Sequence, residues 1–120
     1  MALNTTNPTG TEAWKNLQNH YNAIHETTIQ ELFQQDKTRA EKFNLQWNDF
    51  LVDYSKNNIS QETVSLLLEL ANSIGLKDAV AQYFGGALIN QTENRAVLHT
   101  ALRAPESSVI NVDGENVIPE

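Results

Sequence analysis

Polar residues open the chain, and a helical pattern of apolar residues follows them. Four apolar side chains recur at three- and four-residue steps, which is the spacing of one helix face: Trp14, Leu17, Tyr21 and Ile24. Thr9 and Glu12 have the spacing of a capping box, so we expect this helix to begin there. Residues 1–10 are polar and unpatterned, and we expect them to be disordered or extended.

The stretch from residue 28 to residue 53 predicts short helices followed by a hairpin. A second capping box spans residues 28–31, and a charged stretch over 36–42 follows it. From residue 43 the apolar period changes from helical spacing to two, which is typical of a strand. Asn48 and Asp49 are turn residues, so we expect a β-hairpin at about 43–53.

Three further helices are predicted in the second half of the chain. The first starts at Ser60, stops at Gly75 and has a helical apolar stripe made of Val64, Leu67, Leu68, Ala71 and Ile74. A shorter helix should cover 76–84 and end at Gly85-Gly86. Residues 95–102 also have a helical pattern, which Pro105 closes.

The last segment predicts a second hairpin. Residues 109–112 and 115–118 have strand character and flank Asp113-Gly114, a strong turn signal. Pro119-Glu120 has the composition of the first turn of a helix. The segment is therefore expected to be mostly α-helical with two short β-hairpins.

Composition and charge exclude several classes of function. The chain has 8 basic and 15 acidic residues, a formal net charge of −7, so phosphate backbones and anionic membranes would repel it. It has no cysteine, which excludes disulfides and thiolate sites, and no apolar stretch near the ~20 residues of a membrane span. The first residues do not resemble a signal peptide. We expect a soluble, cytoplasmic protein with no nucleic-acid or membrane partner.

The histidines give no catalytic or metal-binding pattern. None of the three has another histidine four residues away, the spacing that presents two imidazoles to one metal. His20 and His25 lie in a polar helix tail, where we expect them to be solvated. His99 lies within the predicted apolar helix and is expected to be a hydrogen-bonded structural residue.

Three other polar clusters have structural explanations. Residues 53–56 (Asp-Tyr-Ser-Lys) are expected to form a turn and cap, because their spacing does not suit a nucleophile and base. Gly85-Gly86 lacks a P-loop lysine and suits a helix stop. The helix dipole would favour the Glu93 carboxylate near the N-terminus of the predicted helix. Arg95 could form an ion pair with a partner segment. We expect no catalytic, substrate-binding or metal-binding residue.

Three runs resemble glucose-6-phosphate isomerases. Residues 50–57 resemble the family's hhxDYSKN stretch, and 89–103 its INxTE(G/N)RAVLHxALR run. Residues 112–120 resemble its VDGxxVxPEV segment, in the family's order and at similar separations. Asn94 stands where animal members tend to have glycine.

This resemblance implies an enzyme several times longer, with two sugar-isomerase-type α/β/α domains, working as a homodimer. Such enzymes interconvert glucose 6-phosphate and fructose 6-phosphate through an enediol, in glycolysis and gluconeogenesis, without a metal or organic cofactor. Residues 11–120 would be an N-terminal segment that stops before the first sugar-isomerase domain. The family's glutamate base, histidine, lysine and phosphate loop lie in a later portion, so this segment is expected to be structural and inactive alone.

Two other interpretations remain open at this point. The chain could be a self-sufficient helical protein-interaction module, whose distinguishing feature would be an intact core. It could also be one half of an enzyme that associates with a separate catalytic chain.

Overall fold

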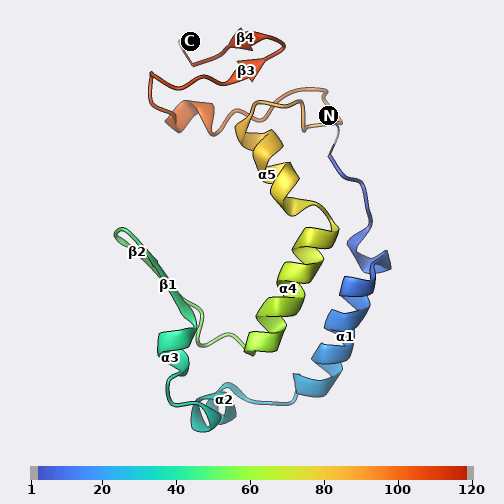
Figure 1. Cartoon of the computed structure of the whole chain (residues 1–120), viewed down its shortest axis with the longest axis vertical. Coiled ribbons are helices and arrows are strands. Elements are labelled where there is room, and N and C mark those ends of the chain that lie inside the picture. The colour runs from blue at the N-terminus through green and yellow to red at the C-terminus, as the bar shows by residue number, and fades with distance from the viewer. Residues whose placement is uncertain (1–2, 119–120) are drawn as a thin grey trace. The chain divides into compact units, whose positions relative to one another are not determined.

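The computed structural model describes residues 3–118, which form two compact units. One unit comprises residues 12–68, and the other comprises residues 3–11 together with 69–118. Figure 1 shows the order of the elements along the chain. Pro119-Glu120, where the sequence predicts a helix start, lies outside the described residues.

Short helices make up most of the first unit. They are α1 (Glu12–Ile24), α2 (Ile29–Gln35), α3 (Arg39–Lys42) and the first part of α4 (Gln61–Ser73). The capping box before α2 is confirmed, because Thr28 Oγ1 accepts from the Glu31 amide at 3.2 Å and the Glu31 carboxylate accepts from the Thr28 amide at 2.8 Å. Helix α4 begins after Ser60 as predicted.

The capping box predicted for Thr9 and Glu12 is wrong. Asn7 caps a short 3-10 helix, η1 (Pro8–Gly10), and its side chain accepts from the Thr9 amide at 3.1 Å. Thr9 is therefore inside this turn, and α1 begins only at Glu12. Proline in the first position favours η1, since proline needs no amide partner there.

The first predicted hairpin is confirmed. Strands β1 (Asn44–Trp47) and β2 (Phe50–Asp53) pair antiparallel, with Trp47 opposite Phe50. Asn48 occupies the turn at φ 49°, a left-handed conformation that asparagine tolerates well. The Tyr54 amide donates to the Phe43 carbonyl at 2.9 Å, which extends the pairing beyond the strands.

Asp36, which follows α2, provides a test of this unit at low pH. A hydrogen bond from Lys42 Nζ at 2.7 Å, together with bonds from Thr38, lowers the pKa of its carboxyl from 3.8 to about 2. Because the pKa is lower in the folded chain, the carboxylate stabilises the fold above about pH 4, and this contribution is lost as the pH falls towards 2. We expect the urea midpoint of the wild type to fall more steeply over this window than that of Asp36→Asn. Lys42→Met should also flatten the profile, and parallel profiles would contradict the assignment.

The second unit contains the end of α4, helix α5 (Leu76–Phe84), the 3-10 helix η2 (Ala101–Arg103) and a hairpin of β3 (Asn111–Val112) with β4 (Glu115–Asn116). The predicted helix stops are confirmed: Gly75 has φ 74° after α4, and Gly85 follows α5. The second hairpin is also confirmed, with both turn residues at positive φ. Near the N-terminus, Asn4 Nδ2 donates to the carbonyl of Ile74 at 3.2 Å.

The helix predicted over residues 95–102 is wrong. Asn90 and Arg95 exchange two backbone hydrogen bonds, of 3.1 and 3.2 Å, across a tight turn. Asn94, just before Arg95, has a left-handed backbone at φ 51°, and residues 96–98 have no helical structure. Only η2 is helical in this stretch.

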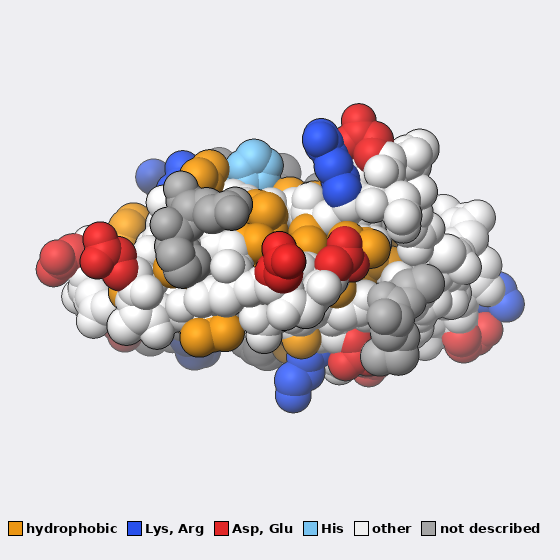
Figure 2. Space-filling model, turned by 90° about the horizontal axis from the view of Figure 1, so that it is seen from above, with side chains coloured by type: hydrophobic (Ala, Val, Ile, Leu, Met, Phe, Trp, Pro, Cys, Tyr) orange, Lys and Arg blue, Asp and Glu red, His pale blue; other side chains and the backbone are white. Residues whose placement is uncertain are grey.

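The hydrophobic core is small. Among the described residues only two hydrophobic side chains are buried, Phe43 in the first unit and Ile110 in the second. Within residues 3–118, fourteen large hydrophobic side chains are exposed, and Figure 2 shows hydrophobic side chains reaching the surface beside carboxylates. The intact core that would distinguish a self-sufficient module is thus not found in the described part of the chain. None of the helices described has the length and apolar character needed to cross a membrane.

Candidate functional site

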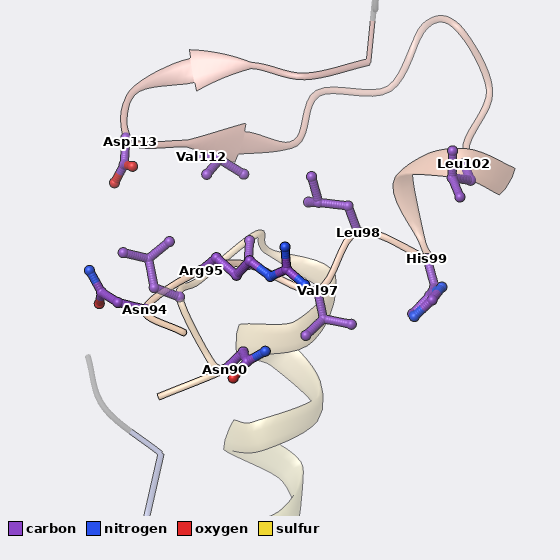
Figure 3. A pocket seen from close by; sticks show the side chains of 11 residues that line it. Asn90, Asn94, Arg95, Val97, Leu98, His99, Leu102, Val112 and Asp113 are labelled. Carbon is purple, nitrogen blue, oxygen red and sulfur yellow. The ribbon is translucent and has the colours of Figure 1, made fainter. Parts of the chain in front are cut away.

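The turn between Asn90 and Arg95 borders a pocket of about 600 Å³ in the second unit. The turn lies within residues 89–103, one of the three runs that resemble the family. Figure 3 shows Asp113, at the end of β3, on the opposite side of this pocket from His99. Apolar side chains, including Leu98 and Val112, line much of the space between them.

Both polar atoms of the Asn90 side-chain amide make hydrogen bonds within the turn. Its Oδ1 accepts from Thr92 Oγ1 at 3.1 Å and from the Glu93 amide at 3.3 Å. Its Nδ2 donates to Glu93 Oε2 at 2.9 Å. The polar groups of this motif therefore satisfy one another and hold the loop.

Glu93 and Arg95 form an ion pair, with 2.7 Å between Oε2 and Nε. The sequence placed Glu93 at a helix N-terminus, and this interpretation is wrong because no helix begins there. Both side chains are more than half exposed, so the pair contributes little to stability. The Arg95 guanidinium has this carboxylate partner within its own turn.

Asn94 adopts φ 51°, which explains the residue types at this position. Left-handed backbone favours glycine and asparagine, the two residues of the family pattern. We expect Asn94→Gly to leave the free energy of unfolding nearly unchanged, and Asn94→Val to lower it by about 1–2 kcal/mol. Urea unfolding of the two variants would measure the difference, and equal effects would show that the conformation at residue 94 does not determine the choice.

The prediction that His20 is solvated is wrong. Its ring is buried between α1 and α4, where Nε2 lies 2.6 Å from Thr63 Oγ1 and Nδ1 lies 3.5 Å from Glu62 Oε2. The Thr63 oxygen also accepts from the Ser60 amide at 2.9 Å, so the histidine joins α1 to the cap of α4. The prediction failed because the end of α1 was interpreted as a polar tail, whereas the partners of His20 lie on α4.

The other two histidines are exposed. For His25 this confirms the expectation, and its ring stacks on Tyr21 with 5.0 Å between centroids. His99 was expected within an apolar helix, and that interpretation is wrong because the helix is absent. Figure 3 shows its ring away from Asp113, so these two groups do not form an acid–base pair.

Residues 53–56 form the turn that the sequence predicts. Asp53 Oδ1 accepts from the Ser55 amide at 2.9 Å, and hydrogen bonds from the Ser55 side chain and backbone lower the pKa of the Asp53 carboxyl. Ser55 is fully buried, and Lys56 is exposed. Because Ser55 is buried, its hydroxyl cannot contact a substrate at the surface.

Sequence reasoning missed Arg39, which is 3% exposed. Its Nε donates to the Ser55 carbonyl, and its Nη2 donates to the carbonyls of Asn57 and Ile59, all at 2.8 Å. The guanidinium also lies 4.3 Å from the Phe43 ring centroid. Among the described residues no carboxylate pairs with it, so backbone carbonyls and aromatic faces solvate its charge. Its position in a charged stretch gave no signal of this role.

Within residues 3–118, histidines and carboxylates do not gather into a group of three or more that could hold a metal ion. The titratable side chains of the candidate site are likewise engaged in turns or separated from one another. The candidate site is therefore a hydrogen-bonded turn beside an apolar pocket.

Comparisons with known proteins agree with the three motif runs. The family model described as phosphoglucose isomerase matches residues 53–120, more than half of the chain. A curated glucose-6-phosphate isomerase from Christiangramia forsetii is 53% identical over 118 residues, which is 98% of this chain and 22% of that protein. The chain thus spans about a fifth of the length of this relative.

Proposed function

The chain belongs to the phosphoglucose isomerase family, and from that premise we propose that it forms part of an enzyme that interconverts glucose 6-phosphate and fructose 6-phosphate. The observation that carries this proposal is the 53% identity to a glucose-6-phosphate isomerase along 98% of the chain. The reaction opens the sugar ring and moves a proton between C2 and C1 through an enediol. It therefore needs a base, groups for ring opening and a phosphate pocket.

We propose that this chain contributes structure to that enzyme and none of its catalytic, substrate-binding or metal-binding residues. The contacts of the candidate site support this division, because Asn90, Glu93 and Arg95 bind one another. The buried His20 and Arg39 join helices and loops. The small core also suits a segment that packs against a larger body.

A chimera tests the proposed function. The region of the Christiangramia forsetii enzyme that matches this chain would be exchanged for the chain itself. We expect isomerase turnover within about tenfold of the parent enzyme, because a structural segment of the same family should support the same site. A soluble, folded chimera without turnover would contradict the proposal.

The finer parts of the proposal follow the family resemblance. The enzyme acts on hexose 6-phosphates in the cytoplasm, in glycolysis and gluconeogenesis, and works as a homodimer. The printed name of the relative supports the substrate class. Sedimentation of the chimera would test the dimer, with a monomer as the contrary result.

A further inference from the structure

The β1–β2 hairpin has one apolar face. Residues directly opposite each other in an antiparallel pair share a face, and faces alternate along each strand. The register pairs Leu45 with Val52 and Trp47 with Phe50, so these four side chains share one face, here named the hairpin face. The Trp47 and Phe50 rings stack at 5.8 Å between centroids. The opposite face is mostly polar: Asn44, Gln46, Leu51 and Asp53.

The hairpin face is open to solvent. The exposed fractions are 65% for Leu45, 70% for Trp47, 67% for Phe50 and 56% for Val52. A contiguous apolar surface of this kind marks an interaction site, and a two-stranded hairpin alone is only marginally stable. Covering the face would bury apolar area and stabilise the strand pair.

Among the described residues, other parts of the chain cover only the base of the hairpin. Phe43 and Tyr54 continue the strand pairing there, and their rings meet edge to face at 5.7 Å. Phe43 is buried, with the Arg39 guanidinium over its ring. The base is therefore anchored, whereas the hairpin face beyond it is exposed to solvent.

We propose that the hairpin face docks on an apolar surface in the part of the isomerase polypeptide that lies outside this chain. This inference rests on the proposed function. The identity to the Christiangramia forsetii enzyme runs through 98% of this chain, and most of that protein's length lies outside the match. The hairpin thus belongs to a region shared with a much longer protein, which offers ample surface to cover it.

A second copy of the chain is a weaker occupant. A stable interface buries about 800 Å² on each partner, whereas a buried aromatic side chain supplies about 150–250 Å². Two aromatic and two aliphatic side chains fall short of that area. A surface on the same polypeptide avoids most of the entropic cost of association, so a small face suffices.

Hydrogen exchange in the chimera described above tests the docking. Backbone amides of residues 44–53 would be compared between the isolated chain and the chimera. We expect exchange in the chimera to be at least about tenfold slower, because docking suppresses opening of the strands. Equal rates in the two proteins would overturn the proposal.

Two leucines of the hairpin provide a matched pair of variants. Leu45 and Leu51 are both 65% exposed but lie on opposite faces. In the chimera, Leu45→Thr should accelerate hairpin exchange about tenfold more than Leu51→Thr, since only Leu45 is buried by docking. In the isolated chain the two variants should behave alike. Equal effects in the chimera would overturn the proposal.

The remaining outcomes separate docking from function. Protection of the hairpin without turnover would support docking and contradict the proposed function. Turnover without protection would support the proposed function and contradict docking. Protection that also arises in the isolated chain and grows with its concentration would assign the face to a second copy and overturn the proposal. Should the chimera be insoluble, the isolated chain should bind anilinonaphthalene sulfonate, less with Leu45→Thr than with Leu51→Thr. Dye binding unchanged by Leu45→Thr would overturn the proposal.

Discussion

Replacing Arg39 by methionine is expected to lower the free energy of unfolding of the first unit by about 3–5 kcal/mol. The guanidinium donates three hydrogen bonds to the carbonyls of Ser55, Asn57 and Ile59. Methionine fills much of the same volume but leaves these acceptors without their donors. It also removes the cation from the Phe43 ring. Urea unfolding followed by circular dichroism would measure the loss.

Arg39→Lys serves as the control for charge. Lysine keeps the positive charge but cannot place donors as the planar guanidinium does, so it should recover less than half of the loss. Lys37→Met removes a nearby cation that is exposed, and it should change little. If Arg39→Met were as stable as Lys37→Met, the guanidinium would not be holding the loop.

Gly86→Ala is expected to destabilise the second unit by about 2–5 kcal/mol. Gly86 has φ 78°, and a Cβ placed there would lie 2.7 Å from the carbonyl oxygen of Asn111 on β3. The substitution therefore adds a collision with backbone to the cost of left-handed alanine. Thermal or urea unfolding would measure the change.

Gly114→Ala separates these two costs. Gly114 has φ 88° in the β3–β4 turn, but a Cβ there would meet nothing within 4 Å. We expect it to cost only the conformational part, about 1–2 kcal/mol. Equal losses for the two alanine variants would show that the end of α5 does not need glycine for its approach to β3.

Local signals in the sequence were sufficient for most of the elements. Both hairpins follow from turn residues that tolerate positive φ, Asn48 in the first and Asp113-Gly114 in the second. Helix α4 follows from its cap and its stop at Gly75. The segment after Asn94 has a helical apolar pattern, but the left-handed backbone at Asn94 and the bonds between Asn90 and Arg95 override it. The spacing of apolar residues carries no signal for such a turn.

Contacts between distant segments were beyond sequence reasoning. His20 is buried because Thr63 and Glu62, more than 40 residues later, provide its partners. Arg39 is buried because carbonyls 16 to 20 residues later converge on it. The turn at residues 53–56 follows from the sequence, whereas at the candidate site the helix assigned to Arg95 and His99 is wrong.

Isomerase turnover of the purified chain alone tests most directly the proposal that this chain supports an isomerase without containing its catalytic groups. The protein would come from a host that lacks its own glucose-6-phosphate isomerase, and fructose 6-phosphate would be supplied, with oxidation of the glucose 6-phosphate formed as the readout. We predict a rate indistinguishable from buffer under conditions in which the chimera turns over. Turnover by the isolated chain that scales with its concentration would contradict the proposal.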